Sequence, residues 1–320
     1  MVTTRLSTPA VGVAAVLVAA VLGPTPAHAA TPSLGGARIA VHFDLGQGQT
    51  PENVALAPGG GMYVTFAKGR QVAEVTRHGA VRILATMPVP ADGGVHTPAL
   101  GFPLTTGIVR AHDGTLYFLY ATGTADLTGL WRLRPGGEPL RIAALPANGL
   151  PNGLALDERA ATLYVADSTL ATIWSVPTRG GNATAWSTGP ELTADGFLGA
   201  NGLKIHNGAV WATDLDHGTV LRIPVLADGR AGRIQTTATG LQGIDDFAFT
   251  GDGDQLLAAV DGQNLVALVQ PDGTHTTVLT PADGLENPTS IAVRGDTVYV
   301  LNAAYLTGKD PNLILARLRD

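Results

Sequence analysis

The sequence contains no cysteine, and this absence excludes disulfide bonds, thiolate metal sites and a cysteine nucleophile. Stability must therefore come from packing and strand pairing. Lysine is scarce as well: Lys68, Lys204 and Lys309 are the only three in 320 residues, and the net charge is −6. An acidic chain whose basic residues are scattered is not expected to bind nucleic acid.

Common catalytic signatures are also missing. The chain has no Gly-x-Ser-x-Gly elbow, no phosphate-binding loop, no His-Glu-x-x-His pair and no dinucleotide-binding fingerprint. The sequence therefore does not indicate an α/β-hydrolase, a P-loop nucleotidase, a zinc protease with this motif or a nicotinamide-dependent enzyme.

Long apolar runs are confined to the N-terminus. Arg5 precedes an apolar stretch from Val11 to Leu22, and Ala27-His28-Ala29 offers a cleavage site of small residues. The stretch is short for a membrane span, and no later segment is longer or more apolar. We expect residues 1–29 to be a signal peptide cleaved after Ala29, and the mature protein to be secreted without a membrane span.

One short pattern recurs six times after residue 50: a polar residue, an apolar strand, a turn rich in Gly and Asp, and a second strand. The polar residues that open the copies are Glu52, Thr106, Asn152, Asn201, Asp245 and Thr289. Their intervals of 54, 46, 49, 44 and 44 residues suit four-stranded propeller blades. Turns such as Asn207-Gly208 favour hairpins within a blade, and no helical pattern competes. The sequence predicts a single all-β domain over residues 30–320, a six-bladed β-propeller and a monomer.

The sixth copy supplies only three strands, at residues 290–294, 297–302 and 313–318, before the sequence ends. Residues 37–45 alternate between apolar and polar side chains and precede the first blade. This segment can provide the missing fourth strand and leave no exposed sheet edge. We therefore expect the ring to be closed by an N-terminal strand.

The opening residues of the six copies should share one height around the central channel, because the first strand of each blade lines it. Glu52 and Asp245 would contribute carboxylates there, and Asn152 and Asn201 would contribute amide oxygens. An oxygen-only set with two negative charges suits a divalent cation such as calcium. Without a cation, repulsion between the carboxylates of Glu52 and Asp245 in the channel would raise the pKa of one of them. Alternatively, Asn and Asp before Gly are ordinary turn residues, although a turn does not account for Glu52.

Three segments resemble the gluconolactonase/regucalcin-like family, which includes diisopropyl fluorophosphatase. They are Pro-Asn-Gly-Leu-Ala-Leu-Asp…Leu-Tyr-Val-Ala-Asp-Ser over 151–168, Asn-Gly-Leu at 201–203 and Asn-Pro-Thr-Ser-Ile-Ala at 287–292. The resemblance covers essentially the whole chain after the signal segment. It implies a six-bladed propeller with calcium deep in its channel, although other divalent cations remain possible. By motif position it implies the metal ligands Glu52, Asn152, Asn201 and Asp245.

The chain departs from this family at two places. Sugar lactonases of the family usually carry Arg-x-Asn-Asp in the second blade, where this chain has Pro-Leu-Thr-Thr-Gly-Ile over 103–108. The resemblance therefore does not extend to a sugar-acid lactone as substrate. The family's aspartate is usually followed by glycine, whereas Asp246 follows Asp245 here. Strand alternation predicts that Asp246 points away from the channel and has a structural role.

The resemblance implies a calcium-dependent hydrolase in which the cation polarises a lactone, ester or phosphoryl oxygen of a small-molecule substrate. Asp245, ahead of Glu52, is the expected catalytic carboxylate, as general base or as nucleophile. Two alternatives stay open. One is a noncatalytic propeller that binds a ligand or a protein and holds calcium structurally; the other is a non-hydrolytic enzyme, such as a lyase, with the same pocket.

Two kinds of loop should lie on the face of the propeller that carries the predicted metal ligands, here called the metal face. One kind connects the fourth strand of a blade to the first strand of the next blade, and the other connects the second and third strands within a blade. Candidate substrate-binding residues on the ring or this face are Thr106, Thr289, His96, Tyr120 and His217. A histidine there could transfer protons near neutral pH, but each is more simply explained as a solvated loop residue. Asp167, Asp214 and Asp261 recur after second strands and are expected to brace turns through backbone hydrogen bonds.

Overall fold

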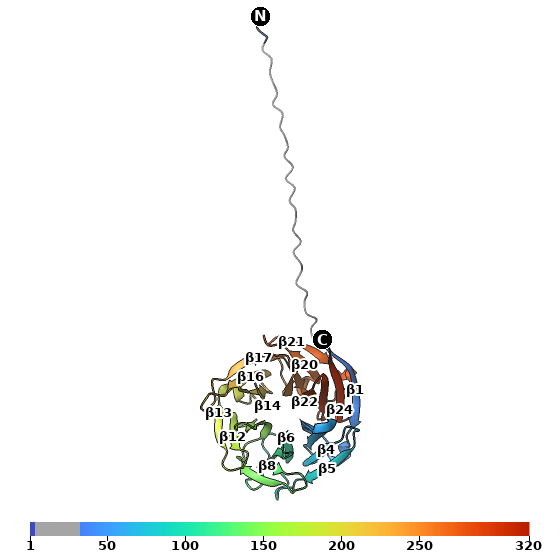
Figure 1. Ribbon diagram of the computed structural model, residues 1–320, viewed down its shortest axis with the longest axis vertical. Helices are drawn as coiled ribbons and strands as arrows, with labels where there is room; N and C mark the ends of the chain where they lie inside the picture. Colours follow the sequence, from blue (N-terminus) through green and yellow to red (C-terminus); the bar gives the residue numbers. More distant parts are fainter. Residues whose placement is uncertain (4–32, 320) are drawn as a thin grey trace. The chain divides into compact units, whose positions relative to one another are not determined.

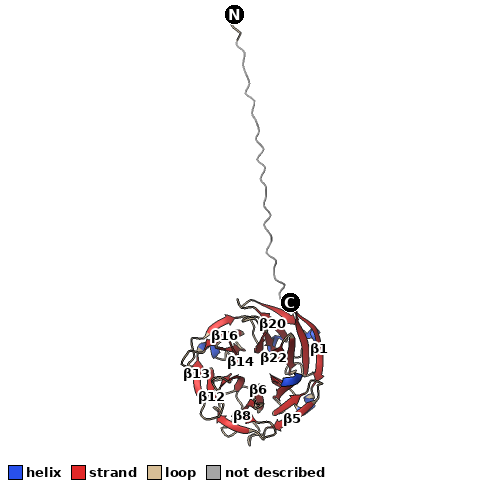
Figure 2. Ribbon diagram, in the orientation of Figure 1, coloured by secondary structure: helices blue, strands red, loops and turns tan. Residues whose placement is uncertain are grey.

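The computed structural model describes residues 1–3 and 33–319, and the expected signal peptide lies almost entirely outside this part of the chain. Six antiparallel sheets of four strands are arranged around a central axis (Figure 1). Strands and short connections make up the ring, with only 3-10 turns as helical elements (Figure 2). The prediction of an all-β, six-bladed propeller is confirmed. Within the described residues no helix is long and apolar enough to cross a membrane.

Each blade takes its strands in sequence order from the axis outward, except the last. Blades 1 to 3 consist of β2 (Pro51–Leu56), β3 (Met62–Phe66), β4 (Gln71–Val75) and β5 (Val81–Thr86); β6 (Leu104–Arg110), β7 (Leu116–Ala121), β8 (Gly129–Leu133) and β9 (Leu140–Ala144); and β10 (Pro151–Asp157), β11 (Thr162–Asp167), β12 (Thr172–Pro177) and β13 (Thr184–Thr188).

Blades 4 to 6 consist of β14 (Ala200–His206), β15 (Ala209–Asp214), β16 (Thr219–Pro224) and β17 (Gln235–Ala238); β18 (Ile244–Phe249), β19 (Leu256–Val260), β20 (Leu265–Val269) and β21 (His275–Leu279); and β22 (Pro288–Arg294), β23 (Thr297–Asn302), β24 (Asn312–Arg319) and β1 (Ser33–His42). The 3-10 turns are η1 (Leu45–Gln47), η2 (Pro58–Gly60), η3 (Pro190–Leu192), η4 (Asp261–Gln263) and η5 (Pro281–Asp283).

Local sequence accounts for the hairpins and for the position of the core. Asn207 and Gly208 both have positive φ, 46° and 69°, as a tight hairpin turn between β14 and β15 requires. Second strands such as β15 are buried along their whole length because neighbouring blades cover both faces. Outer strands such as β13 are largely exposed. The core is thus divided into clusters between adjacent blades, for example the one that includes Trp211 and Phe247.

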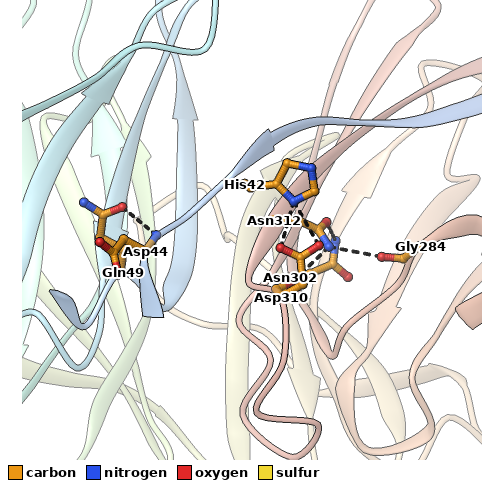
Figure 3. Close-up of polar contacts among 7 residues, drawn as sticks. All are labelled: His42, Asp44, Gln49, Gly284, Asn302, Asp310 and Asn312. Carbon is orange, nitrogen blue, oxygen red and sulfur yellow. Dashed lines mark hydrogen bonds and ion pairs between the residues drawn. The ribbon is translucent and has the colours of Figure 1, made fainter. Parts of the chain in front are cut away.

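The N-terminal strand β1 pairs with β24 and completes blade 6, which confirms the expected closure. It begins before the predicted segment and ends at His42, because Asp44 accepts hydrogen bonds from the backbone N–H groups of Gly46 and Gln47 and starts η1. Figure 3 shows side-chain contacts around this closure, with ring nitrogen Nδ1 of His42 lying 2.8 Å from a carboxylate oxygen of Asp310.

In the same blade, Asn312 on β24 bonds to strand β23 and to the turn that follows η5. Its Nδ2 donates to the carbonyl of Gly284 at 3.1 Å, while its Oδ1 accepts from Asn302 Nδ2 at 3.0 Å (Figure 3). Both asparagines are buried. Buried amides that are fully paired stabilise one arrangement of the strands, so the closing sheet is held by side chains as well as by its ladder.

Candidate functional site

A pocket of about 250 Å³ opens on one face of the ring, at the entry ends of the inner strands. Its lining comes from inner strands and from loops of the two kinds that the sequence placed on the metal face. Polar lining residues are Glu52, Lys68, Asn152, Asn201, Asp245, Asp261 and Tyr305. Apolar lining residues are Leu100, Phe102, Leu104, Phe197, Leu198, Leu215 and Leu306. Polar groups on inner strands form the base of the pocket, and leucine and phenylalanine side chains line it as well.

The four predicted metal ligands are brought together in this pocket. Glu52 lies on β2, Asn152 on β10, Asn201 on β14 and Asp245 on β18, and all four line the cavity. Their exposures are 7%, 8%, 2% and 7%. The structure thus brings these four side chains into one cavity. As ligands they stay a prediction, because the arrangement shows proximity and not a bound ion.

The two threonines of the repeat have different surroundings. Thr106 donates its hydroxyl to the carbonyl of Pro151 at 2.8 Å, and Thr289 donates to the carbonyl of Pro51 at 2.8 Å. Both are fully buried, and neither lines the pocket. Each hydroxyl joins the inner strand of its own blade to that of the next blade. A contact of either threonine with a substrate remains only a prediction from the sequence.

Asp246 corrects an expectation, because it faces the channel. Ile244 pairs with Val260 and Phe247 with Ala258, so β18 has one residue more than its partner over this stretch. Such a bulge breaks strict strand alternation and lets two consecutive side chains share a face. The Asp246 carboxylate consequently reaches Asn53 of blade 1 at 3.1 Å, two blades away.

Asp246 is the centre of a buried polar network beneath the pocket. Its Oδ2 also accepts from the Ser290 hydroxyl at 2.6 Å, and its Oδ1 forms an ion pair with Lys204 Nζ at 2.5 Å. Asp246 is 1% exposed, so the ammonium group of Lys204 compensates a charge that water does not reach. The contacts of Asp246 are thus consistent with the structural role expected for it. The prediction that its side chain points away from the channel was wrong.

Asp261 and Tyr305 are pocket residues that were not among the candidate site residues. The Tyr305 hydroxyl donates to Glu52 Oε2 at 2.5 Å. Asp261 follows β19, and its Oδ1 is buried with no hydrogen-bond partner in the described part of the chain. One indication from the sequence that these two residues could line the pocket is their place in loops between second and third strands on the metal face. Their neighbours in the sequence did not distinguish them from other residues of such loops.

The equivalent aspartates of blades 3 and 4 do brace turns, as expected. Asp167 Oδ1 accepts from the backbone N–H of Leu150 at 2.9 Å, and Asp214 Oδ1 accepts from the backbone N–H of His217 at 2.9 Å. Asp261 lacks such a contact and lines the pocket instead. The same residue type at the same repeat position thus has two different environments.

The three carboxyl groups of the pocket have raised pKa values. Burial, and then repulsion from Glu52, raise the pKa of Asp245 well above its ordinary value. Burial raises the pKa of Glu52 to about 7 although the Tyr305 hydroxyl lowers it in part. Burial likewise raises the pKa of Asp261 to about 7. Three acids that resist ionisation therefore share one small cavity.

This donor set fits a divalent cation. Two carboxylates and two amides supply hard oxygens, and Asp261 Oδ1 has no hydrogen-bond partner among residues 33–319. A positive charge in the pocket would lower the raised pKa values of the carboxyl groups. Among the described residues no three His, Cys, Asp or Glu side chains form a metal-binding group. A site here would therefore depend on the amide oxygens of Asn152 and Asn201.

The remaining substrate-binding candidates do not line this pocket. His96 is exposed and lies 2.8 Å from Asp92, and the ring of His217 lies 3.3 Å from Asp214. Tyr120 is fully buried and donates its hydroxyl to the carbonyl of Pro88 at 2.6 Å, which anchors the loop after β5. Contacts of these residues with a substrate remain predictions.

No family model matches the chain, and no curated protein matches it. Solved structures with a similar fold include a gluconolactonase from Xanthomonas campestris, with TM-score 0.65 and 15% identity over 90% of this chain and 91% of the other. They also include the calcium-binding protein regucalcin from Agrobacterium tumefaciens, with TM-score 0.61 and 15% identity over 84% and 90%. A virginiamycin B lyase from Staphylococcus aureus has TM-score 0.60 and 13% identity over 90% and 100%.

At these identities the likeness concerns the fold. Because regucalcin and gluconolactonase are six-bladed propellers, the resemblance seen in the sequence is supported at the level of architecture. The chain is thus a six-bladed propeller of the same fold as the regucalcin and gluconolactonase structures.

Proposed function

We propose that the protein is a secreted, calcium-dependent hydrolase that acts on a small ester, lactone or phosphotriester in the channel pocket. The observation that supports this most is the cluster of two carboxylates and two amides that lines the pocket, with raised pKa values at both carboxylates. Groups that are costly to ionise in a concave site are typical of catalytic and metal sites. The gluconolactonase and regucalcin neighbours are in keeping with it.

Glu52, Asn152, Asn201 and Asp245 would hold the cation, which would supply Lewis acidity toward a carbonyl or phosphoryl oxygen. The protein's own groups define the rest. Tyr305 fixes Glu52 by its hydrogen bond, so Glu52 is oriented before substrate enters. The apolar side chains around the pocket exclude water, which strengthens electrostatic interactions at its base. The Asp245 carboxylate would accept a proton from attacking water or attack the substrate itself.

The test is turnover of a panel of aryl esters, lactones and organophosphates by chelated protein during titration with calcium. Asp245→Asn should lower kcat/KM at least about 100-fold, because it removes the acid–base group. Asn152→Ala should weaken calcium affinity about tenfold or more, measured by calorimetry. The control is Asp228→Asn, an exposed aspartate paired with Arg230. The intact mass of protein recovered outside the cell should place its N-terminus at Ala30.

Each result has a distinct meaning. Unchanged turnover in both pocket variants would contradict the proposal. No turnover with any substrate, together with calcium-dependent stabilisation that Asn152→Ala abolishes, would instead indicate a noncatalytic propeller with a structural ion. Normal secretion of protein that still begins at residue 1 would contradict cleavage after Ala29.

Elimination is the second candidate reaction, because a virginiamycin B lyase shares the fold over 90% of this chain. The same pocket carboxylates could remove a proton from carbon instead of from water. Mass spectrometry of the products separates the two reactions: hydrolysis adds the mass of one water to the substrate, whereas elimination adds nothing.

A further inference from the structure

We propose that the pocket takes a small, largely apolar substrate with one anionic group, and that Lys68 contacts this group. The inference rests on the proposed function and narrows it to a substrate class. It is drawn from the side chains that line the pocket and from the surroundings of Lys68.

The apolar lining argues against a polyhydroxylated substrate. Seven leucine and phenylalanine side chains line the cavity, and five of these residues belong to one apolar cluster with Ala67, Ala121 and Leu150. A hydroxyl group buried against such side chains loses its hydrogen bonds to water without replacement, which disfavours its binding. An acyl chain or aromatic ring gains free energy on the same surface. The pocket therefore favours apolar substrate bodies.

Few polar groups remain for recognition once the proposed ligands are set aside. The Tyr305 hydroxyl is already bonded to Glu52. Asp261 would repel an anion and could accept from a donor. Lys68 is the one basic side chain among the residues that line the pocket.

Lys68 is held beside the base of the pocket and has no carboxylate partner among the residues that the structure describes. Its Nζ lies 5.7 Å from the ring centroid of Tyr305, whose hydroxyl contacts Glu52. Its backbone N–H donates to the Thr50 hydroxyl at 3.1 Å, which fixes the loop between β3 and β4. In the described part of the chain no ion pair involves Lys68. The ammonium group thus lies near the Tyr305 ring and is available to a ligand.

The charges in the pocket support a single anion. A divalent cation would offset Glu52 and Asp245, which leaves Lys68 as the one positive side chain and Asp261 as the one remaining acid of the lining. We therefore expect a ligand to carry no more than one negative charge, and its anionic group to lie beside Lys68, near the Tyr305 ring.

The experiment measures binding and turnover with matched anionic and neutral probes. Calorimetry compares para-toluenesulfonate with para-toluenesulfonamide on calcium-loaded protein, and kinetics compare para-acetoxybenzoate with para-acetoxybenzamide. The anionic probe of each pair should be favoured about fivefold, as for a partly exposed ion pair. Lys68→Met should remove the preference, and Lys68→Arg should keep it. Lys309→Met is the control, because Lys309 is exposed in a loop of the same face and does not line the pocket.

A preference that persists in Lys68→Met, or equal binding of both probes to the parent protein, would overturn the inference. Binding does not require hydrolysis, so the calorimetric comparison remains decisive even if no ester is turned over. Conversely, calcium-dependent hydrolysis without any preference for the anionic ester would leave the proposed function standing and refute the role of Lys68.

Discussion

Three aspartates at corresponding positions of consecutive blades show how strongly single residues depend on their surroundings. Asp167 and Asp214 accept backbone hydrogen bonds that hold turns, whereas the Asp261 carboxylate accepts no such bond in the described structure and lines the pocket. Burial raises the pKa of Asp261 to about 7. Its ionisation should therefore oppose folding in the absence of a cation.

Asp261→Asn tests this directly. Because the folded pKa is raised above the ordinary value, the stability linked to protonated Asp261 is complete below about pH 4 and is lost as pH rises through about 7. In chelated protein the variant should gain about 2 to 4 kcal/mol over the parent at pH 8 and almost nothing at pH 4. Urea unfolding at the two pH values measures it. An equal effect at both pH values would show that ionisation is not the cause.

The candidate site could be predicted from sequence only in part. Glu52, Asn152, Asn201 and Asp245 share one position of the repeat, so their meeting in the pocket followed from periodicity. Asp261, Tyr305 and Lys68 come from loops, whose side-chain directions no repeat specifies. Thr106 shares the repeat position, yet its short side chain bonds to a neighbouring strand.

Among the strands, all six inner strands depart from regular pairing near their first residues, and in β18 two carboxylates lie at this place. The bulge of β18 turns both Asp245 and Asp246 toward the channel, at the pocket and beneath it. Gly153 on β10 has a related role: a Cβ there would lie 2.0 Å from the carbonyl oxygen of Asn201, so only glycine lets the two inner strands approach. Adjacent inner strands therefore lie close together here, and the Asp246 carboxylate is bonded to Asn53 two blades away.

Lys204→Met tests the element-level role of this network. The substitution leaves the buried Asp246 carboxylate without its cation and should cost about 3 kcal/mol of unfolding free energy. The double variant Lys204→Met, Asp246→Asn should recover most of the loss, because no uncompensated charge remains. Urea unfolding of the parent, Lys204→Met, Asp246→Asn and the double variant gives the coupling energy. Additive effects in this cycle would show that the ion pair does not stabilise the channel.

For the whole molecule, closure of the ring depends on a strand from the other end of the chain. β1 pairs with β24 along most of its length, from Ser33 with Arg319 to His42 with Asn312. Without β1, the unpaired edge of β24 would be available to another chain. The closure thus couples the first described strand to the last.

Removal of residues 1–42 should therefore abolish the monomeric folded state, whereas a chain that begins at Ala30 should unfold at the same temperature as the full-length protein. Size-exclusion chromatography and thermal unfolding followed by circular dichroism measure the outcome. A monomeric, cooperatively folded chain without β1 would contradict the proposed dependence on closure.

The sequence by itself determined the six-bladed fold, the closing strand and the four polar positions in the pocket, because each follows from a repeat whose period the chain itself contains. Tertiary structure alone decided which loop side chains complete the pocket, since loop direction depends on neighbouring blades. It also decided that Asp246 faces the channel, because a bulge arises from the pairing of two strands. The apolar lining of the pocket, and the position of Lys68 without an ion pair among the described residues, result from that assembly, and the expected substrate class depends on both.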